Sequence, residues 1–193
     1  ENGIQESLKS YQAVDEIPFD YERRIMSTVV RKGEELTLIA KGAPESVLRR
    51  CKYAEIMGRN ELIDSVLESI NAKTTDLYED GYRILAVAYR RVDSKNSYSV
   101  EDESNLTLVG FLVFTDPPKK DAHQAVTRLK ETGVDVKILT GDNKLVAVKI
   151  CEDIKVPVKK VIDGSELTRM SLTEIREAVE EATIFARITP EQK

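Results

Sequence analysis

Thr140-Gly141-Asp142-Asn143 combines residue types that suit phosphate binding. The tetrapeptide follows a predicted strand over residues 134–139 and precedes a segment with helical spacing, which is where open α/β sheets bind ligands. A hydroxyl, a glycine amide open to close approach and the positive end of a helix can together hold a phosphate. The same residue types are common in simple turns and helix caps, so both interpretations stay open at this point.

Arg187 and Lys193 follow another predicted strand, residues 183–186. Cations in this position can offset the charge of a phosphoryl group during transfer. A basic residue on a solvated loop is the alternative interpretation for either of them. The two predicted strand ends reinforce each other as a phosphate site.

Lys41-Gly42-Ala43-Pro44-Glu45 follows a predicted hairpin. Pro44 and Glu45 are explained by a helix start, with proline in the first turn and an acid near the positive helix end. That explanation does not cover Lys41 and Gly42, which suit a pocket where an ammonium group and the backbone approach a planar polar ligand. Two further side chains stay ambiguous: Phe19 is either core or a platform for a base, and Arg83 stands at a strand entrance.

Composition narrows the class of protein. The 193 residues are 41% hydrophobic and 33% charged, as expected of a soluble globular protein with one large or two small domains. A net charge of -5 with interleaved signs leaves no broad positive face for nucleic acid. Cys51 and Cys151 are far apart in sequence, which predicts buried free thiols in a reducing compartment. No run approaches the roughly 20 apolar residues of a membrane span, and no P-loop motif is present.

The first part of the chain predicts an α+β domain with an antiparallel sheet. Strands are expected over residues 26–30 and 36–40, joined by a polar gap, and over 84–89 and 106–114. A helix is expected from Ile63 to Leu77, with Gly81 as its stop. The polar segment of residues 93–105 predicts an exposed loop.

Asp116-Pro117-Pro118 marks a change of pattern, because two prolines fix two φ angles and remove two amide donors. Strands and helices then alternate, with helices expected over residues 122–129, from Asn143, and after a Ser171–Glu174 capping box. Alternation of this kind predicts a parallel, Rossmann-like sheet. We therefore expect two domains, residues 1–114 and 115–193.

In their order and spacing, these motifs resemble the P-type cation-transporting ATPases over nearly the full chain, and most of all their magnesium-transporting subfamily. The resemblance implies an antiparallel-sheet nucleotide-binding domain followed by part of a phosphorylation domain of haloacid-dehalogenase type, with Asp116 at the hinge. It also implies ATP and Mg2+ as cofactors. A calcium-pump-like ATPase and a soluble phosphatase of haloacid-dehalogenase type are the alternatives.

The resemblance also implies roles for individual residues. Phe19 would stack on adenine, Lys41 and Gly42 would line the base pocket, and no residue is assigned to a protein-bound metal. The full set implied for nucleotide binding is Phe19, Arg24, Met26, Lys41, Gly42, Arg83, Asp116 and Arg187. The set implied for the transfer chemistry is Thr140, Gly141, Asp142 and Lys193.

The sequence departs from the family's pattern in one decisive way: the Asp-Lys-Thr-Gly-Thr motif, whose aspartate becomes the acyl phosphate, is absent. We therefore expect a parent pump to supply this aspartate. In that pump the chain would lie at the cytoplasmic face of a cell membrane, with a membrane domain and further cytosolic domains as its partners. The chain begins without methionine and ends just after a motif, so we expect a piece of a longer protein that binds ATP without turning it over. Uncovered sheet edges predict self-association or poor order after about residue 118.

Overall fold

The computed structural model describes residues 9–193, and the chain forms two compact units. The first unit comprises residues up to 74 together with 84–112, and the second comprises 75–83 and 113–193. Separate clusters of buried apolar side chains, one in the first unit and two in the second, give each unit its own core.

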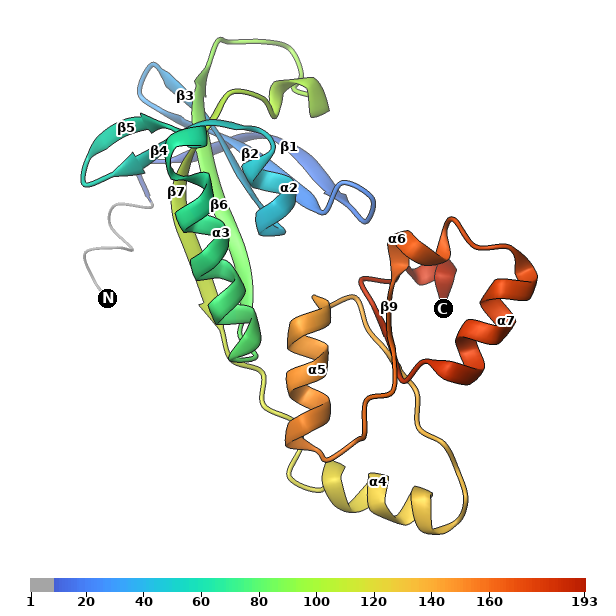
Figure 1. Ribbon diagram of the computed structural model, residues 1–193. Helices are drawn as coiled ribbons and strands as arrows, with labels where there is room; N and C mark the ends of the chain where they lie inside the picture. Colours follow the sequence, from blue (N-terminus) through green and yellow to red (C-terminus); the bar gives the residue numbers. More distant parts are fainter. Residues whose placement is uncertain (1–8) are drawn as a thin grey trace. The chain divides into compact units, whose positions relative to one another are not determined.

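A seven-stranded sheet forms the first unit, and its strands are β1 (Gln12–Asp20), β2 (Ile25–Lys32), β3 (Glu35–Gly42), β4 (Cys51–Ile56), β5 (Arg59–Leu62), β6 (Arg83–Val92) and β7 (Leu106–Phe114). Their order in space is β1-β2-β3-β6-β7-β4-β5 (Figure 1). The pairs β1–β2, β2–β3, β3–β6 and β4–β5 are antiparallel, whereas β4 and β7 are parallel. The predicted antiparallel sheet is thus confirmed, with one parallel pair and three strands, β1, β4 and β5, that the sequence pattern did not predict.

Alternating burial along β3 shows why the predicted hairpin forms. Leu38 and Ala40 are fully buried, whereas Ile39 and Lys41 between and after them are exposed. This period of two places one face of the strand on the core. Gly33, in the turn between β2 and β3, has a φ of 60°, a conformation that glycine adopts at low cost.

Two helices cover the buried face of this sheet. The short helix α2 (Pro44–Leu48) begins at the predicted proline, and α3 (Ile63–Glu79) is the predicted amphipathic helix. In Figure 1, α3 lies along β6 and β7. Gly81, at a φ of 84°, follows α3 as expected. The α3 side chains that contact the core are Ile63, Val66, Leu67 and Ile70.

The prediction of an exposed loop over residues 93–105 is wrong for Tyr98, Asp102 and Glu103, which are buried. Asp102 and Glu103 are only 6% and 1% exposed. A 3-10 helix, η1 (Val100–Asp102), forms there, and Ser99 N donates to an Asp102 carboxylate oxygen at 3.0 Å. The polar composition of the segment predicted exposure. Burial of these carboxylates depends on hydrogen-bond partners that are distant in sequence, and the segment itself does not reveal them.

Three parallel strands form the sheet of the second unit: β8 (Ile138–Leu139), β9 (Val161–Asp163) and β10 (Ile184–Ala186), in the order β8-β10-β9. The helices of the unit are α4 (Ala122–Glu131), α5 (Lys144–Asp153), α6 (Gly164–Leu167), α7 (Leu172–Glu181) and η2 (Pro190–Gln192). Alternation of strands and helices is confirmed. The strand predicted over residues 134–139 is limited to its last two residues. Just before it, Lys137 Nζ donates to the carbonyl oxygens of Glu180 and Ala182 at 2.9 and 2.8 Å.

Helix caps in the second unit form as predicted. The side chain of Asn143 accepts a hydrogen bond from Leu145 N at 2.9 Å at the start of α5. At the start of α7, Glu174 N donates to Ser171 Oγ, while Ser171 N donates to the Glu174 carboxylate. Such caps satisfy amide groups that have no partner within the helix. Among residues 9–193, no helix has both the length and the apolar character that crossing a membrane requires.

Substitution of Leu38 by alanine tests the core of the first unit. Because Leu38 is fully buried, Leu38→Ala should lower the free energy of unfolding by about 2–5 kcal/mol. Ile39→Ala is the matched control on the same strand, where the side chain is 37% exposed, and it should cost less than about 1 kcal/mol. Urea unfolding followed by circular dichroism measures both, and equal losses would contradict this account of the sheet.

The two cysteines test burial in both units. Cys51 and Cys151 are buried free thiols, as predicted, and burial raises their pKa to about 12 and about 11. Because only the thiolate reacts with a disulfide reagent, both should remain unmodified at pH 8, where a cysteine of ordinary pKa, about 8.5, reacts readily. Labelling with a chromogenic disulfide should therefore require denaturant. Rapid reaction of either thiol in the native protein would show that the core around that cysteine is open.

Candidate functional site

Lys41 and Gly42 lie at the end of β3, next to the start of β2. Met26 is the strand partner of Lys41, and Ile25 is the partner of Gly42. Because side chains alternate along a strand, Met26 and Lys41 share the face opposite to buried Ile25. The fold thus brings Met26, Lys41 and Gly42 together, which sequence separation alone did not require.

Gly42 is required by a close backbone approach. A Cβ atom at this position would collide with the carbonyl oxygen of Arg24 and lie 2.9 Å from the Cα of Ile25. The same Arg24 carbonyl accepts a hydrogen bond from Ala43 N at 3.0 Å. Arg24 itself has a φ of 56°, which is unusual for a residue with a side chain, and its guanidinium lies 3.8 Å from Glu45. The backbone of residues 41–43 is therefore packed directly against the turn before β2, and we call this contact the Gly42 joint.

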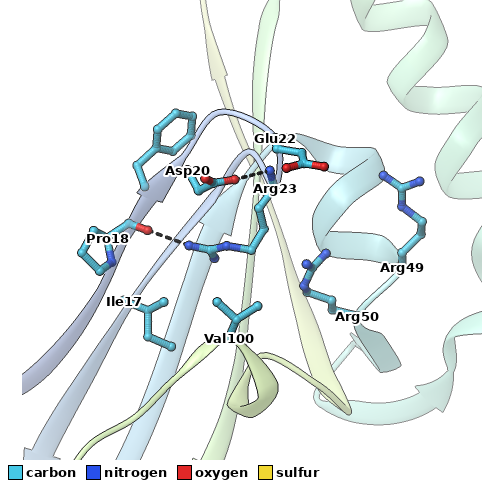
Figure 2. A pocket seen from close by; sticks show the side chains of 9 residues that line it. Ile17, Pro18, Asp20, Glu22, Arg23, Arg49, Arg50 and Val100 are labelled. Atoms are coloured by element: carbon cyan, nitrogen blue, oxygen red, sulfur yellow. Dashed lines mark hydrogen bonds between the residues drawn. The ribbon is translucent and has the colours of Figure 1, made fainter. Parts of the chain in front are cut away.

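Phe19 is exposed near the end of β1. Half of its surface is accessible, and its ring contacts Tyr21 edge to face with centroids 5.2 Å apart. This exposure favours the interpretation as a platform over that as a core residue. Phe19 and the turn that follows β1 border a hollow of about 810 Å³, shown in Figure 2. Three arginines line that hollow: Arg23, Arg49 and Arg50.

Glu103 is the residue of this region that sequence reasoning missed. Its side chain is fully buried, and its two carboxylate oxygens lie 2.5 and 2.6 Å from Arg23 Nη1. Ser27 Oγ donates to it at 2.6 Å, and Arg50 Nε lies 3.7 Å away. A capping signal at Ser99, with an acid three residues later, could have predicted the short helix that precedes Glu103.

Three strand ends of the second unit carry candidate residues. Thr140 follows β8, Gly164 follows β9, and Arg187 follows β10, all at the carboxyl edge of a parallel sheet. Arg187 N donates to the carbonyl oxygen of Asp142 at 3.0 Å, and Ile188 N donates to that of Thr140 at 3.1 Å. The loops after β8 and β10 are therefore joined. This edge is where open α/β sheets bind ligands.

The Asp142 carboxylate accepts hydrogen bonds from two other side chains at this edge. Thr140 Oγ1 donates to its carboxylate at 2.9 Å, and Asp142 N donates back to Thr140 Oγ1 at 3.1 Å. Arg83, which groups with the second unit, donates through Nη2 to the same carboxylate at 2.9 Å and through Nη1 to Asp116. Arg83 Nε is buried and has no hydrogen-bond partner among the described residues. Four predicted residues thus lie in one hydrogen-bonded cluster.

Gly164 was also missed by sequence reasoning. A Cβ atom there would lie 2.5 Å from the carbonyl oxygen of Arg187 and 2.8 Å from the side-chain oxygen of Gln192. Gln192 Nε2 in turn donates to the carbonyl oxygen of Gly164 at 2.8 Å. These contacts hold η2, and with it exposed Lys193, beside the strand ends. The capping box of Asp163 and Glu166 around this glycine was the available signal.

Comparison with known proteins bears on both units. The family model of the P-type ATPase cytoplasmic domain N matches residues 2–121, more than half of the chain. The chain is 38% identical over 196 aligned positions to "Magnesium-transporting ATPase, P-type 1" of Escherichia coli K12, covering 98% of this chain and 22% of that protein. For the protein of the same name from Salmonella typhimurium LT2, the identity is 38% over 93% of this chain and 20% of that protein.

A calcium-transporting relative shows a lower identity. "Calcium-transporting ATPase 1" of Lactococcus lactis is 31% identical over 92% of this chain and 21% of its own length. The chain thus spans about a fifth of the length of the curated relatives that it matches. Since the family model covers more than half of the chain, the protein belongs to the P-type ATPases, and its residues 2–121 correspond to their cytoplasmic domain N.

Proposed function

We propose that this chain is the ATP-handling part of a pump that couples ATP hydrolysis, through an aspartyl phosphate, to cation transport across a membrane. The first unit binds the adenine end of the nucleotide, and the second handles the phosphoryl group. The observation that carries the proposal is the joint at Gly42. There the backbone of residues 41–43 is fixed against the Arg24 turn, and the ammonium group of Lys41 stays exposed.

In the first unit, the proposed adenine contacts are Phe19, Met26 and the Lys41-Gly42 backbone. An exposed aromatic ring can stack on a base, and such stacking is worth about 1–3 kcal/mol. Lys41, on the same sheet face as Met26, supplies a positive charge for the nucleotide. We assign Arg24 to the same ligand, because it directly precedes Ile25, the strand partner of Gly42.

In the second unit, we assign the transferred phosphoryl group to the carboxyl edge of the parallel sheet. Thr140 and Gly141 provide a hydroxyl and an open amide, and Lys193 and Arg187 provide positive charge. The three-stranded parallel sheet supports the assignment of this unit as part of a phosphorylation domain of haloacid-dehalogenase type. Arg83, exchanging its carboxylate partners for phosphate, would contribute a further cation to the nucleotide.

Magnesium is the proposed cargo, because the relatives of 38% identity are named for magnesium transport. Calcium is the alternative, supported by the relative of 31% identity. Mg2+ would also accompany ATP, since this ion is usually bound through nucleotide phosphates with few protein ligands. A membrane domain and other cytosolic domains of the pump, at the cytoplasmic face of the membrane, are the proposed partners.

The chain taken alone should bind ATP without hydrolysing it through a covalent intermediate. The Asp-Lys-Thr-Gly-Thr motif is absent from the printed sequence, and an acyl phosphate requires that carboxylate. Self-association through the edges of the second sheet remains part of the proposal.

Titration of the chain with MgATP by calorimetry tests the proposed function. Wild type should bind with saturation, and Phe19→Ala and Lys41→Ala should each weaken binding by about tenfold or more, since stacking or a charge-assisted contact is lost. Release of phosphate should stay at background.

Lys73→Ala, an exposed lysine on α3, serves as the matched control and should bind like wild type. The adenine assignment is overturned if a folded wild-type chain does not bind MgATP. It is also overturned if all three variants bind equally well.

A further inference from the structure

We propose that Glu103 is a positioning residue for the nucleotide site and that it acts through Arg23. The segment it positions is residues 18–24, the end of β1 and the turn before β2, which we call the 18–24 turn. The inference rests on the proposed function, because it concerns the placement of Phe19 and Arg24. Glu103 itself is fully buried, so it cannot touch a ligand.

Burial fixes the geometry of the pair. A buried carboxylate is costly unless it is paired and hydrogen-bonded. Glu103 accepts from Arg23 Nη1 through both oxygens and from Ser27 Oγ, which leaves Arg23 little freedom. The Arg23 side chain is itself only 9% exposed. Such a pair adds little net stability, but it selects one arrangement of the chain around it.

Arg23 also makes hydrogen bonds to two other residues of the turn. Its Nη2 donates to the carbonyl oxygen of Pro18 at 2.6 Å, and its backbone N donates to Asp20 Oδ1 at 2.6 Å (Figure 2). Phe19 lies between these two anchored residues. Arg24 follows directly, with its N donating to the carbonyl oxygen of Asp20 at 2.6 Å.

These hydrogen bonds continue from Arg24 to the Gly42 joint. The Arg24 carbonyl accepts from Ala43 N and occupies the space that a Cβ on Gly42 would need. A displaced Arg24 would therefore alter the backbone beside Lys41 as well as the turn. Glu103 thus lies at one end of a continuous path of hydrogen bonds to both proposed adenine-contacting segments.

Only an arginine can fill the intermediate position. The guanidinium uses one terminal nitrogen for Glu103 and the other for the Pro18 carbonyl. A lysine has a single ammonium centre on a flexible stem and cannot match this fork. Arg23→Lys can therefore keep the buried carboxylate paired while it releases the turn.

Two substitutions test the proposal in the complete chain, Glu103→Gln and Arg23→Lys. Both should weaken MgATP binding by about tenfold, the effect expected when one aligned charge-assisted contact is lost. Arg23→Lys should do so with a nearly unchanged urea midpoint, because the buried charge keeps a partner. This second variant keeps the test valid if Glu103→Gln does not fold.

Asp102→Asn is the matched control. It removes the neighbouring partly buried ion pair with Lys95. The Asp102 carboxylate accepts hydrogen bonds from Lys95 Nζ and Ser99 N, both outside the 18–24 turn. If the segment only supports folding, Asp102→Asn and Arg23→Lys should lower stability and affinity together. If Glu103 positions the turn, Asp102→Asn should leave the affinity unchanged even where it lowers the urea midpoint.

A Phe19→Trp reporter gives a second readout, because the chain contains no tryptophan. Adding Arg23→Lys should increase quenching of this tryptophan by acrylamide, and adding Asp102→Asn should not. The positioning role is overturned if wild type binds MgATP and folded Arg23→Lys binds equally well with unchanged quenching. Absence of binding by wild type would instead refute the proposed function, while the quenching comparison would still report on the turn.

Discussion

The buried carboxylate of Glu103 is the constraint on which the backbone of residues 18–24 depends. A charge in this position is tolerated only because Arg23, Ser27 and Arg50 surround it. These residues come from the turn before β2, from β2 itself and from the link between α2 and β4. The same guanidinium that neutralises the carboxylate holds the carbonyl oxygen of Pro18. One electrostatic requirement in the core therefore becomes a fixed backbone shape at the surface.

A different constraint organises the second unit. Its strands run parallel, so their carboxyl ends meet at one edge and bring three loops together. Two backbone hydrogen bonds join the loops after β8 and β10, and Gly164 allows the Arg187 backbone to approach the end of β9. The loops that carry the polar cluster around Asp142 are thus joined by main-chain hydrogen bonds, whereas the turn before β2 in the first unit is held by a side-chain ion pair.

Sequence pattern predicted much of this fold. The β2–β3 hairpin, α3, β6, β7, α4, α5 and both predicted caps lie where periodicity and capping signals indicated. Their success has a local cause, since burial with period 2 or 3.6 and the satisfaction of terminal amides depend on neighbouring residues. β1, β4 and β5 were missed because their mostly exposed residues lack a strong apolar period. Glu103, before β7, was wrongly predicted as exposed for the complementary reason, that its partners Arg23 and Ser27 are distant in sequence.

The sequence by itself determined the family, through the order of its motifs. It also predicted the candidate site residues: Lys41-Gly42-Ala43 after a hairpin, and Thr140-Gly141-Asp142 and Arg187 after predicted strands. Tertiary structure decided which of these residues meet. Strand register put Met26 beside Lys41, and backbone contact explained Gly42 and revealed Gly164. Only the folded chain brings Glu103 to Arg23, 80 positions away. A buried carboxylate needs a charged partner nearby in space, and such a pair produces no periodic pattern in the sequence.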